Sequence, residues 1–336
     1  MLNVAVIGAG YWGPNLVRNF SVCQTTEVAV ICEQRYDRLM KLSSMYPSAK
    51  AVNLIEHVVN DDNVEAVALA TPVASHFPLG MRVLESGRHL LLEKPMAQSV
   101  AEAEKLIETA EKKGVRLMVD HTFCYTGAVR KLKELADKGE FGEAIYFDSV
   151  RVNLGLLQND VNVIWDLAPH DLSIMDFILG QKPKAVSAIG NRFGGYDLET
   201  TAYVTLRFES GMLAHFHVNW MAPVKIRLIM VGGTKKMALY DDMETSEKVR
   251  VYDKGVAIDH SNINDRRELL VSYRSGDMWA PRIDNKEALL LVVQEFAAAI
   301  AEKRAPLTDG NAGLRVVRIL EGAQKSIDKN GSWVEL

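Results

Sequence analysis

A glycine-rich turn directly after the first apolar segment constrains the fold of this chain most. Residues 4–7 are apolar, and the next six read Gly-Ala-Gly-Tyr-Trp-Gly, a G-x-G-x-x-G pattern leading into a helical stretch over residues 15–20. Glycines in such a strand-to-helix turn allow a tight bend and a close approach to a pyrophosphate, which the helix N-terminus also attracts. We predict that this loop binds a dinucleotide through Gly8, Gly10, Tyr11, Trp12 and Gly13.

The first third of the chain alternates short apolar runs with amphipathic stretches. The apolar runs cover residues 4–7, 28–31, 64–69, 89–92 and 115–119, and the helical patterns cover 15–20, 77–85 and 100–112. Short, continuous apolar runs predict strands buried on both faces, and their alternation with helices predicts a doubly wound parallel sheet. We therefore expect an N-terminal Rossmann domain over residues 1–121.

The pattern changes after about residue 122. Helices are predicted at about 128–138 and 166–179, and strands at 144–152, 185–192, 200–208, 212–220, 226–231 and 236–240. Period-2 alternation with glycine-rich turns predicts a large, mostly antiparallel, open-faced sheet. Two further helices, at about 286–302 and 312–327, close the chain. We expect residues 122–336 to form an α+β domain for substrate binding and oligomerisation, which makes the fold class α/β overall.

Composition and charge argue against several other classes of protein. The 336 residues are 48% hydrophobic and 24% charged, which is typical of a globular protein of about two domains. A net charge of −4 with scattered Lys and Arg gives no reason to expect nucleic acid. No apolar run approaches the ~20 residues of a membrane-spanning helix, and the N-terminus lacks the features of a signal peptide. Cys23, Cys32 and Cys124 fit neither a disulfide framework nor a zinc site, so we expect a cytoplasmic protein without a metal.

A carboxylate stands where the glycine pattern requires one. Glu33 ends the second predicted strand, about 20 residues after Gly13. A carboxylate at this position accepts hydrogen bonds from the adenosine ribose and repels the 2′-phosphate of NADP. Arg35 lies close enough to weaken that discrimination. We predict that the cofactor is NAD and that Glu33 is its ribose ligand.

Two polar motifs mark a reactive site. Residues 70–76 read A-T-P-V-A-S-H and residues 93–95 read E-K-P; both follow predicted strands, at whose carboxyl ends doubly wound sheets bind ligands. Farther along, W-D-L-A-P-H-D places Asp166 and His170 four residues apart, on one face of a predicted helix. Histidine can accept a hydroxyl proton near neutral pH, and lysine can stabilise negative charge on the same oxygen. Together these residue types suit the oxidation of an alcohol.

With these motifs the sequence resembles the Gfo/Idh/MocA oxidoreductase family along essentially its whole length. The resemblance rests on the glycine pattern, the A-T-P-x-x-x-H, E-K-P and D-x-x-x-H motifs, and the β-rich second half. It implies that Lys94 and His170 are the catalytic pair and that Asp166 binds or orients the substrate. Which of Lys94 and His170 takes the proton first stays open. The cofactor residues that it implies beyond the glycine loop are Thr71, Pro72, His76, Glu93, Lys94 and Pro95.

Short stretches within this resemblance suggest a substrate class. Residues 10–18, 165–173 and 219–223 resemble the branch that oxidises the 3-hydroxyl of UDP-N-acetylglucosamine or its uronic acid. Members of that branch make a 3-keto sugar for a partner aminotransferase. The alternatives are a free-sugar or inositol dehydrogenase and a reductase that acts on a 3-keto sugar. A cofactor-binding sensor without turnover is another, but the intact Lys94, Asp166 and His170 argue against it.

Four further residues are candidates for the substrate pocket. His121 and Tyr125 follow the last predicted strand of the Rossmann domain, and Arg151 and Asn153 leave a strand at the domain junction. Each could contact the substrate, and each could equally serve packing.

The second domain also carries a histidine pair and an exposed sheet face. His215 and His217 lie two apart on a predicted strand and share a face, but a metal would need a third ligand, so packing or contact with substrate is expected. A broad sheet with an uncovered apolar face is uncommon in a monomer. We therefore expect a homodimer or homotetramer that packs through the second domain.

Overall fold

The computed structural model describes residues 1–155, 157–258 and 271–336. The chain divides into two compact units, each assembled from segments that are distant in sequence. Unit 1 comprises Met1–Thr126, Gln158–Ser173 and Asn285–Gln324, and unit 2 comprises Gly127–Leu157, Ile174–Asp284 and Lys325–Leu336. The assignment of separate roles to residues 1–121 and 122–336 stays a prediction.

Unit 1 is built on a parallel sheet of six strands. Their bounds are β1 (Leu2–Ile7), β2 (Thr26–Cys32), β3 (Lys50–Val52), β4 (Ala66–Leu69), β5 (His89–Glu93) and β6 (Leu117–Asp120). The order is β3-β2-β1-β4-β5-β6, with every neighbouring pair parallel. The strand order reverses between β1 and β4, and ligands bind at such a switch point outside the carboxyl ends of the strands. The predicted Rossmann sheet is therefore confirmed.

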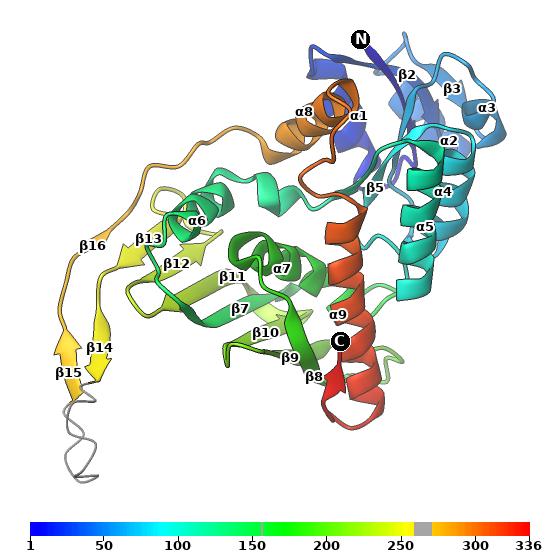
Figure 1. The fold of residues 1–336 in the computed structure, drawn as a ribbon. Coiled ribbons are helices and arrows are strands. Elements are labelled where there is room, and N and C mark those ends of the chain that lie inside the picture. Colours follow the sequence, from blue (N-terminus) through cyan, green and yellow to red (C-terminus); the bar gives the residue numbers. More distant parts are fainter. Residues whose placement is uncertain (156, 259–270) are drawn as a thin grey trace. The chain divides into compact units, whose positions relative to one another are not determined.

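Helices cover both faces of this sheet. Those that lie wholly in unit 1 are α1 (Gly13–Val22), α2 (Tyr36–Ser43), α3 (Glu56–Val59), α4 (His76–Glu85), α5 (Val100–Lys113) and α8 (Ala288–Ala301), with the 3-10 turns η1 (Val73–Ser75) and η2 (Thr122–Tyr125). Helices α4 and α5 pack together on one face, and α1 and α8 pack together on the other (Figure 1). Ser99 caps the start of α5, because its side chain accepts a hydrogen bond from the Glu102 N–H at 3.3 Å.

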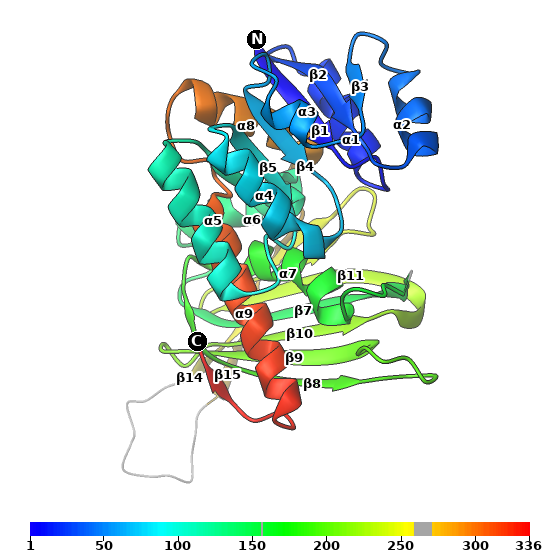
Figure 2. The same cartoon turned by 90° about the vertical axis from the view of Figure 1, so that its right-hand side faces the viewer.

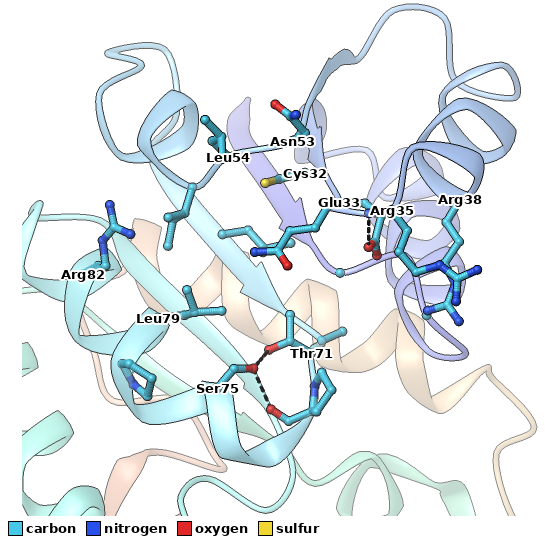
Figure 3. A pocket seen from close by; sticks show the side chains of 18 of the residues that line it. Cys32, Glu33, Arg35, Arg38, Asn53, Leu54, Thr71, Ser75, Leu79 and Arg82 are labelled. Carbon is cyan, nitrogen blue, oxygen red and sulfur yellow. Dashed lines mark hydrogen bonds between the residues drawn. The ribbon is translucent and has the colours of Figure 1, made fainter.

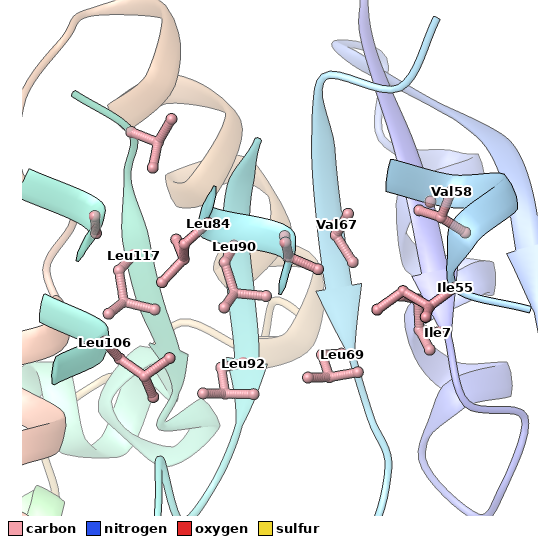
Figure 4. Packing of buried hydrophobic residues seen from close by; sticks show 14 of the residues in the cluster. Ile7, Ile55, Val58, Val67, Leu69, Leu84, Leu90, Leu92, Leu106 and Leu117 are labelled. Atoms are coloured by element: carbon pink, nitrogen blue, oxygen red, sulfur yellow. The ribbon is translucent and has the colours of Figure 1, made fainter. Parts of the chain in front are cut away.

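The core of unit 1 explains why the apolar runs became strands. Val67, Leu69, Leu90 and Leu92 of the central strands are fully buried and pack with Leu106 of α5 (Figure 4). Burying a side chain of this size contributes about 1.5–3 kcal/mol to folding. Because both faces of these strands are covered, their sequences lack polar alternation.

Unit 2 holds a larger sheet of nine strands within the described residues (Figure 2). The bounds are β7 (Ala144–Leu154), β8 (Pro183–Asn191), β9 (Thr201–Phe208), β10 (Leu213–Asn219), β11 (Met221–Gly233), β12 (Met237–Asp241), β13 (Val249–Tyr252), β16 (Met278–Trp279) and β17 (Val334–Glu335). The order is β16-β13-β12-β11-β7-β10-β9-β8-β17, and only the pair of β10 with β7 is parallel among these described strands. A separate ribbon pairs β14 (Gly255–Ile258) with β15 (Val271–Arg274). The mostly antiparallel sheet is confirmed.

The two faces of the large sheet differ in burial. Helix α6 (Gly127–Asp137) and the last residues of α7 (Val163–Leu179) flank one face, and the side chains of β9 and β10 on that face are buried. The side chains that alternate with them are more open, with Tyr203 47% and Leu213 48% exposed. Helix α9 (Gly310–Asp328) completes the described helices. Among the described residues, no helix is both long and apolar enough to cross a membrane.

Candidate active site

A cavity of about 920 Å³ opens at the carboxyl ends of the central strands of unit 1 (Figure 3). Six of the predicted cofactor residues line it, namely Gly8, Gly10, Tyr11, Glu33, Thr71 and Pro72. The predicted residues Trp12, Gly13, His76, Glu93, Lys94 and Pro95 do not line this cavity. The cavity lies where the strand order reverses, as expected for a dinucleotide site.

The three glycines of the loop differ in the space around them, and the differences suit a dinucleotide. A Cβ on Gly8 would lie 2.4 Å from the Ala70 carbonyl oxygen, and its φ of 98° also favours glycine. A Cβ on Gly13 would lie 1.8 Å from the Gly8 carbonyl oxygen, so the turn requires glycine there. At Gly10 the nearest atom would be Nη1 of Arg38 at 3.8 Å, which leaves this glycine open to the cavity. These are the positions at which a tight turn and an approaching pyrophosphate need glycine.

Glu33 already holds the glycine loop. Its Oε2 accepts a hydrogen bond from the Ala9 N–H at 2.7 Å, and its Oε1 accepts one from the Arg35 N–H at 2.9 Å. An ionised carboxylate can accept about four hydrogen bonds, so capacity remains for ribose hydroxyls. The Arg35 guanidinium pairs with Asp37 at 3.0 Å. The residues present thus fit NAD, with Glu33 facing the cavity beside the loop.

The A-T-P segment after β4 forms a compact hydrogen-bonded turn. The Ser75 hydroxyl donates to the Pro72 carbonyl at 2.7 Å and pairs with the Thr71 hydroxyl at 2.7 Å (Figure 3). His76 is buried, and its ring nitrogens lie 2.8 Å from the carbonyl oxygens of Thr71 and Pro95. Burial lowers the pKa of His76, while its contacts with the two carbonyls act in the opposite direction. His76 links the A-T-P and E-K-P segments, and its contact with the cofactor stays a prediction.

Lys94 and Asp166 meet in unit 1. The Lys94 ammonium donates to the Asp166 backbone carbonyl at 2.8 Å and lies 3.5 Å from its Oδ1. The Lys94 side chain is only 13% exposed, which strengthens this pairing relative to a surface ion pair. His170 follows one helical turn after Asp166, and its ring packs edge-on against Phe123 at 5.0 Å between centroids. The contact of Lys94 with Asp166 thereby joins two distant segments, one helical turn before His170.

The start of α7 explains how Asp166 and His170 are presented. The Asn162 side chain caps the helix, because its Oδ1 accepts from the N–H groups of Ile164 and Trp165 at 3.1 and 3.2 Å. Pro169 lies inside the helix and has no N–H to donate to the preceding turn. The bond that Pro169 cannot make is the one to the Trp165 carbonyl, and the next carbonyl along the helix, that of Asp166, accepts from Lys94.

A second acidic residue lies beside the E-K-P motif, and the sequence patterns did not single it out. Asp120 ends β6 directly opposite Glu93, which ends β5. Asp120 is buried, and it accepts hydrogen bonds from Trp12 Nε1 at 3.0 Å and from the Thr122 hydroxyl at 2.7 Å. The signal available in the sequence was an acid directly after a buried apolar strand.

The four other substrate candidates have different surroundings. Tyr125 is fully buried, and its hydroxyl pairs with that of Thr308 at 3.1 Å. His121 is also buried, and burial lowers its pKa to about 3, so its ring is neutral. Arg151 and Asn153 lie on β7 of unit 2, where Arg151 is buried. Contact between these four residues and a substrate stays a prediction.

The histidine pair of β10 stacks on Tyr203 of β9. The Tyr203 ring lies 6.0 Å from the His215 ring and 4.5 Å from the His217 ring, measured between centroids. Thr205 hydrogen-bonds His215 Nδ1 at 3.1 Å. Within the described residues, no group of three or more His, Cys, Asp or Glu side chains could hold a metal ion.

Sequence reasoning also missed several residues of the cavity wall. Two are cations, Arg38 of α2 and Arg82 of α4, and the Arg82 guanidinium is bound to Glu56 at 2.7 Å. Others are Asn53 and Leu54, which follow the short strand β3 (Figure 3). Because β3 spans three residues with two of them exposed, no apolar run predicted it or the loop after it.

Comparison with known proteins agrees with this geometry. Residues 2–121 match the model of an oxidoreductase family with an NAD-binding Rossmann fold, and residues 129–238 match the GFO/IDH/MocA C-terminal domain. The UDP-N-acetylglucosamine 3-dehydrogenase of Acidithiobacillus ferrooxidans is 24% identical over 94% of each chain. Its solved structure matches with a TM-score of 0.82 at 22% identity, covering 98% of both chains.

Other relatives act on different sugars. The NADP-dependent scyllo-inositol 2-dehydrogenase of Bacillus subtilis is 23% identical over 97% of this chain and 92% of its own. Levoglucosan dehydrogenase, solved with NADH, has a TM-score of 0.84 at 19% identity and covers 99% of this chain and 98% of its own. The two family models together span more than half of the sequence. The chain therefore belongs to the Gfo/Idh/MocA oxidoreductase family and is an NAD-binding sugar oxidoreductase.

Proposed function

We propose that this enzyme oxidises a hydroxyl of a nucleotide sugar to a ketone, and that the reacting group is the 3-hydroxyl of a UDP-N-acetylglucosamine-type substrate. Its product would be a 3-keto sugar, which an aminotransferase can consume. The observation that carries the catalytic part is the pairing of Lys94 with Asp166, one turn before His170, in the unit that also holds the dinucleotide cavity.

The chemistry needs a hydride acceptor and a proton acceptor for the same alcohol. When bound, NAD supplies the hydride acceptor at its nicotinamide ring. His170 or Lys94 takes the hydroxyl proton as the carbon–oxygen double bond forms. Asp166 holds the Lys94 side chain in place, and where His170 takes the proton, the Lys94 ammonium hydrogen-bonds the substrate oxygen as negative charge develops on it.

The choice of substrate rests on two kinds of support. Short stretches of the sequence resemble the nucleotide-sugar branch, and the UDP-N-acetylglucosamine 3-dehydrogenase aligns along nearly the whole chain. The names of other relatives support a second candidate, a free-sugar or inositol dehydrogenase. A 3-keto-sugar reductase would use the same residues in the opposite direction.

A substrate panel tests the proposal. The purified enzyme is incubated with NAD and, separately, UDP-N-acetylglucosamine, its uronic acid, myo-inositol, scyllo-inositol and levoglucosan, while the absorbance of reduced nicotinamide is followed. We expect the highest kcat/KM with one of the two UDP-sugars. A 2-oxo acid is included in parallel reactions, because a tightly held cofactor gives no bulk signal unless it is recycled.

Each outcome of the panel has a defined meaning. A preference for an inositol or for levoglucosan contradicts the nucleotide-sugar assignment and favours the second candidate. Turnover only of a chemically prepared 3-keto sugar with NADH favours the reductase. NAD binding without turnover of any compound in either direction supports the sensor.

We also propose that the enzyme is a homodimer or homotetramer assembled through the open face of the unit 2 sheet. The exposed side chains there include Tyr203, Leu213 and Ile226. Light scattering at micromolar concentration should give two or four times the 37.4 kDa mass of the chain. Leu213→Lys should shift the mass toward the monomer, because a buried lysine would be unpaired in a self-complementary interface. A wild-type mass of 37.4 kDa would contradict this assembly.

A further inference from the structure

Two carboxyl groups meet at the ends of neighbouring strands in unit 1. Glu93 and Asp120 are directly paired in the register of the parallel strands β5 and β6, so their side chains leave the same face of the sheet. Asp120 is buried, and Oε2 of the half-buried Glu93 is inaccessible to water; two carboxylates in such a place repel each other strongly. The pair therefore holds a proton more readily than two exposed acids.

The hydrogen bonds identify the charged member of the pair. Each oxygen of Asp120 accepts from a separate donor, Oδ2 from Trp12 Nε1 at 3.0 Å and Oδ1 from the Thr122 hydroxyl at 2.7 Å. Donors that converge on a carboxylate favour its ionised form. Burial raises the pKa of Asp120, while the bonds with Thr122 and Trp12 act in the opposite direction.

Glu93 has the opposite surroundings. Its Oε2 is buried and receives no hydrogen bond. An ionised carboxylate with a bare buried oxygen is costly, whereas a neutral acid can donate its proton to Asp120. Burial, followed by the nearby Asp120 charge, raises the pKa of Glu93 well above 4.5, in agreement with a neutral Glu93.

We propose that Glu93 and Asp120 share one proton and so form an acid–carboxylate pair, whose single negative charge fastens the glycine loop, through Trp12, to the ends of β5 and β6, directly before Lys94. In this pair Glu93 donates its O–H to Asp120. Trp12 precedes the first residue of α1 and lies between Gly10 and Gly13. Both acids are positioning residues that act on the cofactor loop through Trp12.

Three other charged or titratable side chains lie around the pair, namely Lys94, His121 and His76. The Lys94 ammonium, which also pairs with Asp166, is close enough to lower the pKa values of both acids. Next to Asp120, His121 is neutral, because burial, Lys94 and Arg315 all lower its pKa. The pKa of His76 is lowered for the same main reason, its burial.

The shared proton predicts a pH dependence of stability. Because the pKa of Glu93 is raised in the folded protein, the proton stabilises the fold at pH values below the ordinary value of 4.5, and this stabilisation is lost as the pH rises toward the raised value. Above pH 4.5, each added pH unit should increase the unfolding equilibrium constant of wild type, relative to that of Glu93→Gln, by up to about tenfold. Denaturant titrations at a series of pH values measure this difference without substrate or cofactor.

The matched control is Glu108→Gln, an exposed acid on α5 that pairs with Lys105. Above pH 5 the free energy of unfolding of this variant should change with pH as that of wild type does, because Lys105 lowers the pKa of Glu108. Infrared spectra of the same proteins provide a second readout. A protonated carboxylic acid band present in wild type at neutral pH should be absent from Glu93→Gln. Equal pH slopes in wild type and Glu93→Gln, or no loss of this band, would overturn the shared proton.

A double-mutant cycle tests the connection to the loop. Trp12→Phe removes the N–H donor and should weaken NAD binding about tenfold in calorimetric titrations. In an Asp120→Asn background, where the charge on residue 120 is already gone, the same change should cost less than about threefold. Trp333→Phe in unit 2 is the control and should leave NAD affinity at the wild-type value. If the losses of NAD-binding free energy caused by the two substitutions simply add, Trp12 and Asp120 do not act together. The fastening of the loop is then refuted even if the shared proton is found.

Discussion

Replacing Lys94 or His170 with alanine is expected to lower kcat by about 10²–10⁴-fold while leaving NAD affinity nearly unchanged. Both side chains are proposed to act on the reacting oxygen, and neither lines the cavity assigned to the dinucleotide. Because residues that act as a unit are not additive, the double variant should be little slower than the slower single one. Single-turnover hydride transfer, NAD affinity and thermal midpoints are measured on the same proteins.

The controls separate catalysis from stability. Lys105→Ala and His57→Ala change exposed residues of α5 and α3 and should leave kcat and the thermal midpoint close to wild type. If His170 served only packing against Phe123, its loss would lower the thermal midpoint and spare the turnover of the folded fraction. Near-wild-type transfer in a folded His170→Ala variant would refute the proposed mechanism.

Replacing Glu33 with alanine should weaken NAD binding about ten- to hundred-fold and narrow the preference for NAD over NADP. A hydrogen bond to a charged group contributes about 1.5–3 kcal/mol, and this carboxylate also holds the Ala9 and Arg35 N–H groups of the cavity wall. Loss of the charge also removes the repulsion of a 2′-phosphate. Titration with each dinucleotide measures both effects.

The comparison for Glu33 is Glu27→Ala, an exposed acid at the other end of β2, which should bind both dinucleotides as wild type does. An NAD affinity of Glu33→Ala within twofold of wild type would show that Glu33 is not the ribose ligand. If Glu33→Ala weakened the binding of NAD and of NADP equally, Glu33 would serve only to hold the glycine loop.

The sequence predicted the Rossmann sheet well because its signals are local. Continuous apolar runs such as residues 66–69 and 90–92 predict strands that are buried on both faces, and the G-x-G-x-x-G turn marks where the first strand ends and the first helix begins. Strand β3 was missed, because two of its three residues are exposed. Helix α2 was missed for a similar reason, since only Leu39 and Leu42 are buried along it.

The site was predictable only where chemistry follows a motif. The motifs indicated Lys94 and Asp166, and the structure adds the contact between them, which joins segments 72 residues apart. The bond from Trp12 to Asp120 spans 108 residues, and no local pattern encodes such a partner. Arg38 lies on the unpredicted helix α2, so it too could not be assigned to the cavity beforehand.

The most direct test of the central claim is the transfer of deuterium from the sugar to the cofactor. UDP-N-acetylglucosamine that carries deuterium at carbon 3 is mixed with excess enzyme and NAD, and the reduced cofactor is examined by mass spectrometry. We expect NADH that is one mass unit heavier than NADH from unlabelled sugar, together with a 3-keto sugar. We also expect a slower single-turnover step for the deuterated sugar. NADH without deuterium, or no reaction in the presence of a recycling 2-oxo acid, would contradict oxidation of this substrate at the 3-hydroxyl.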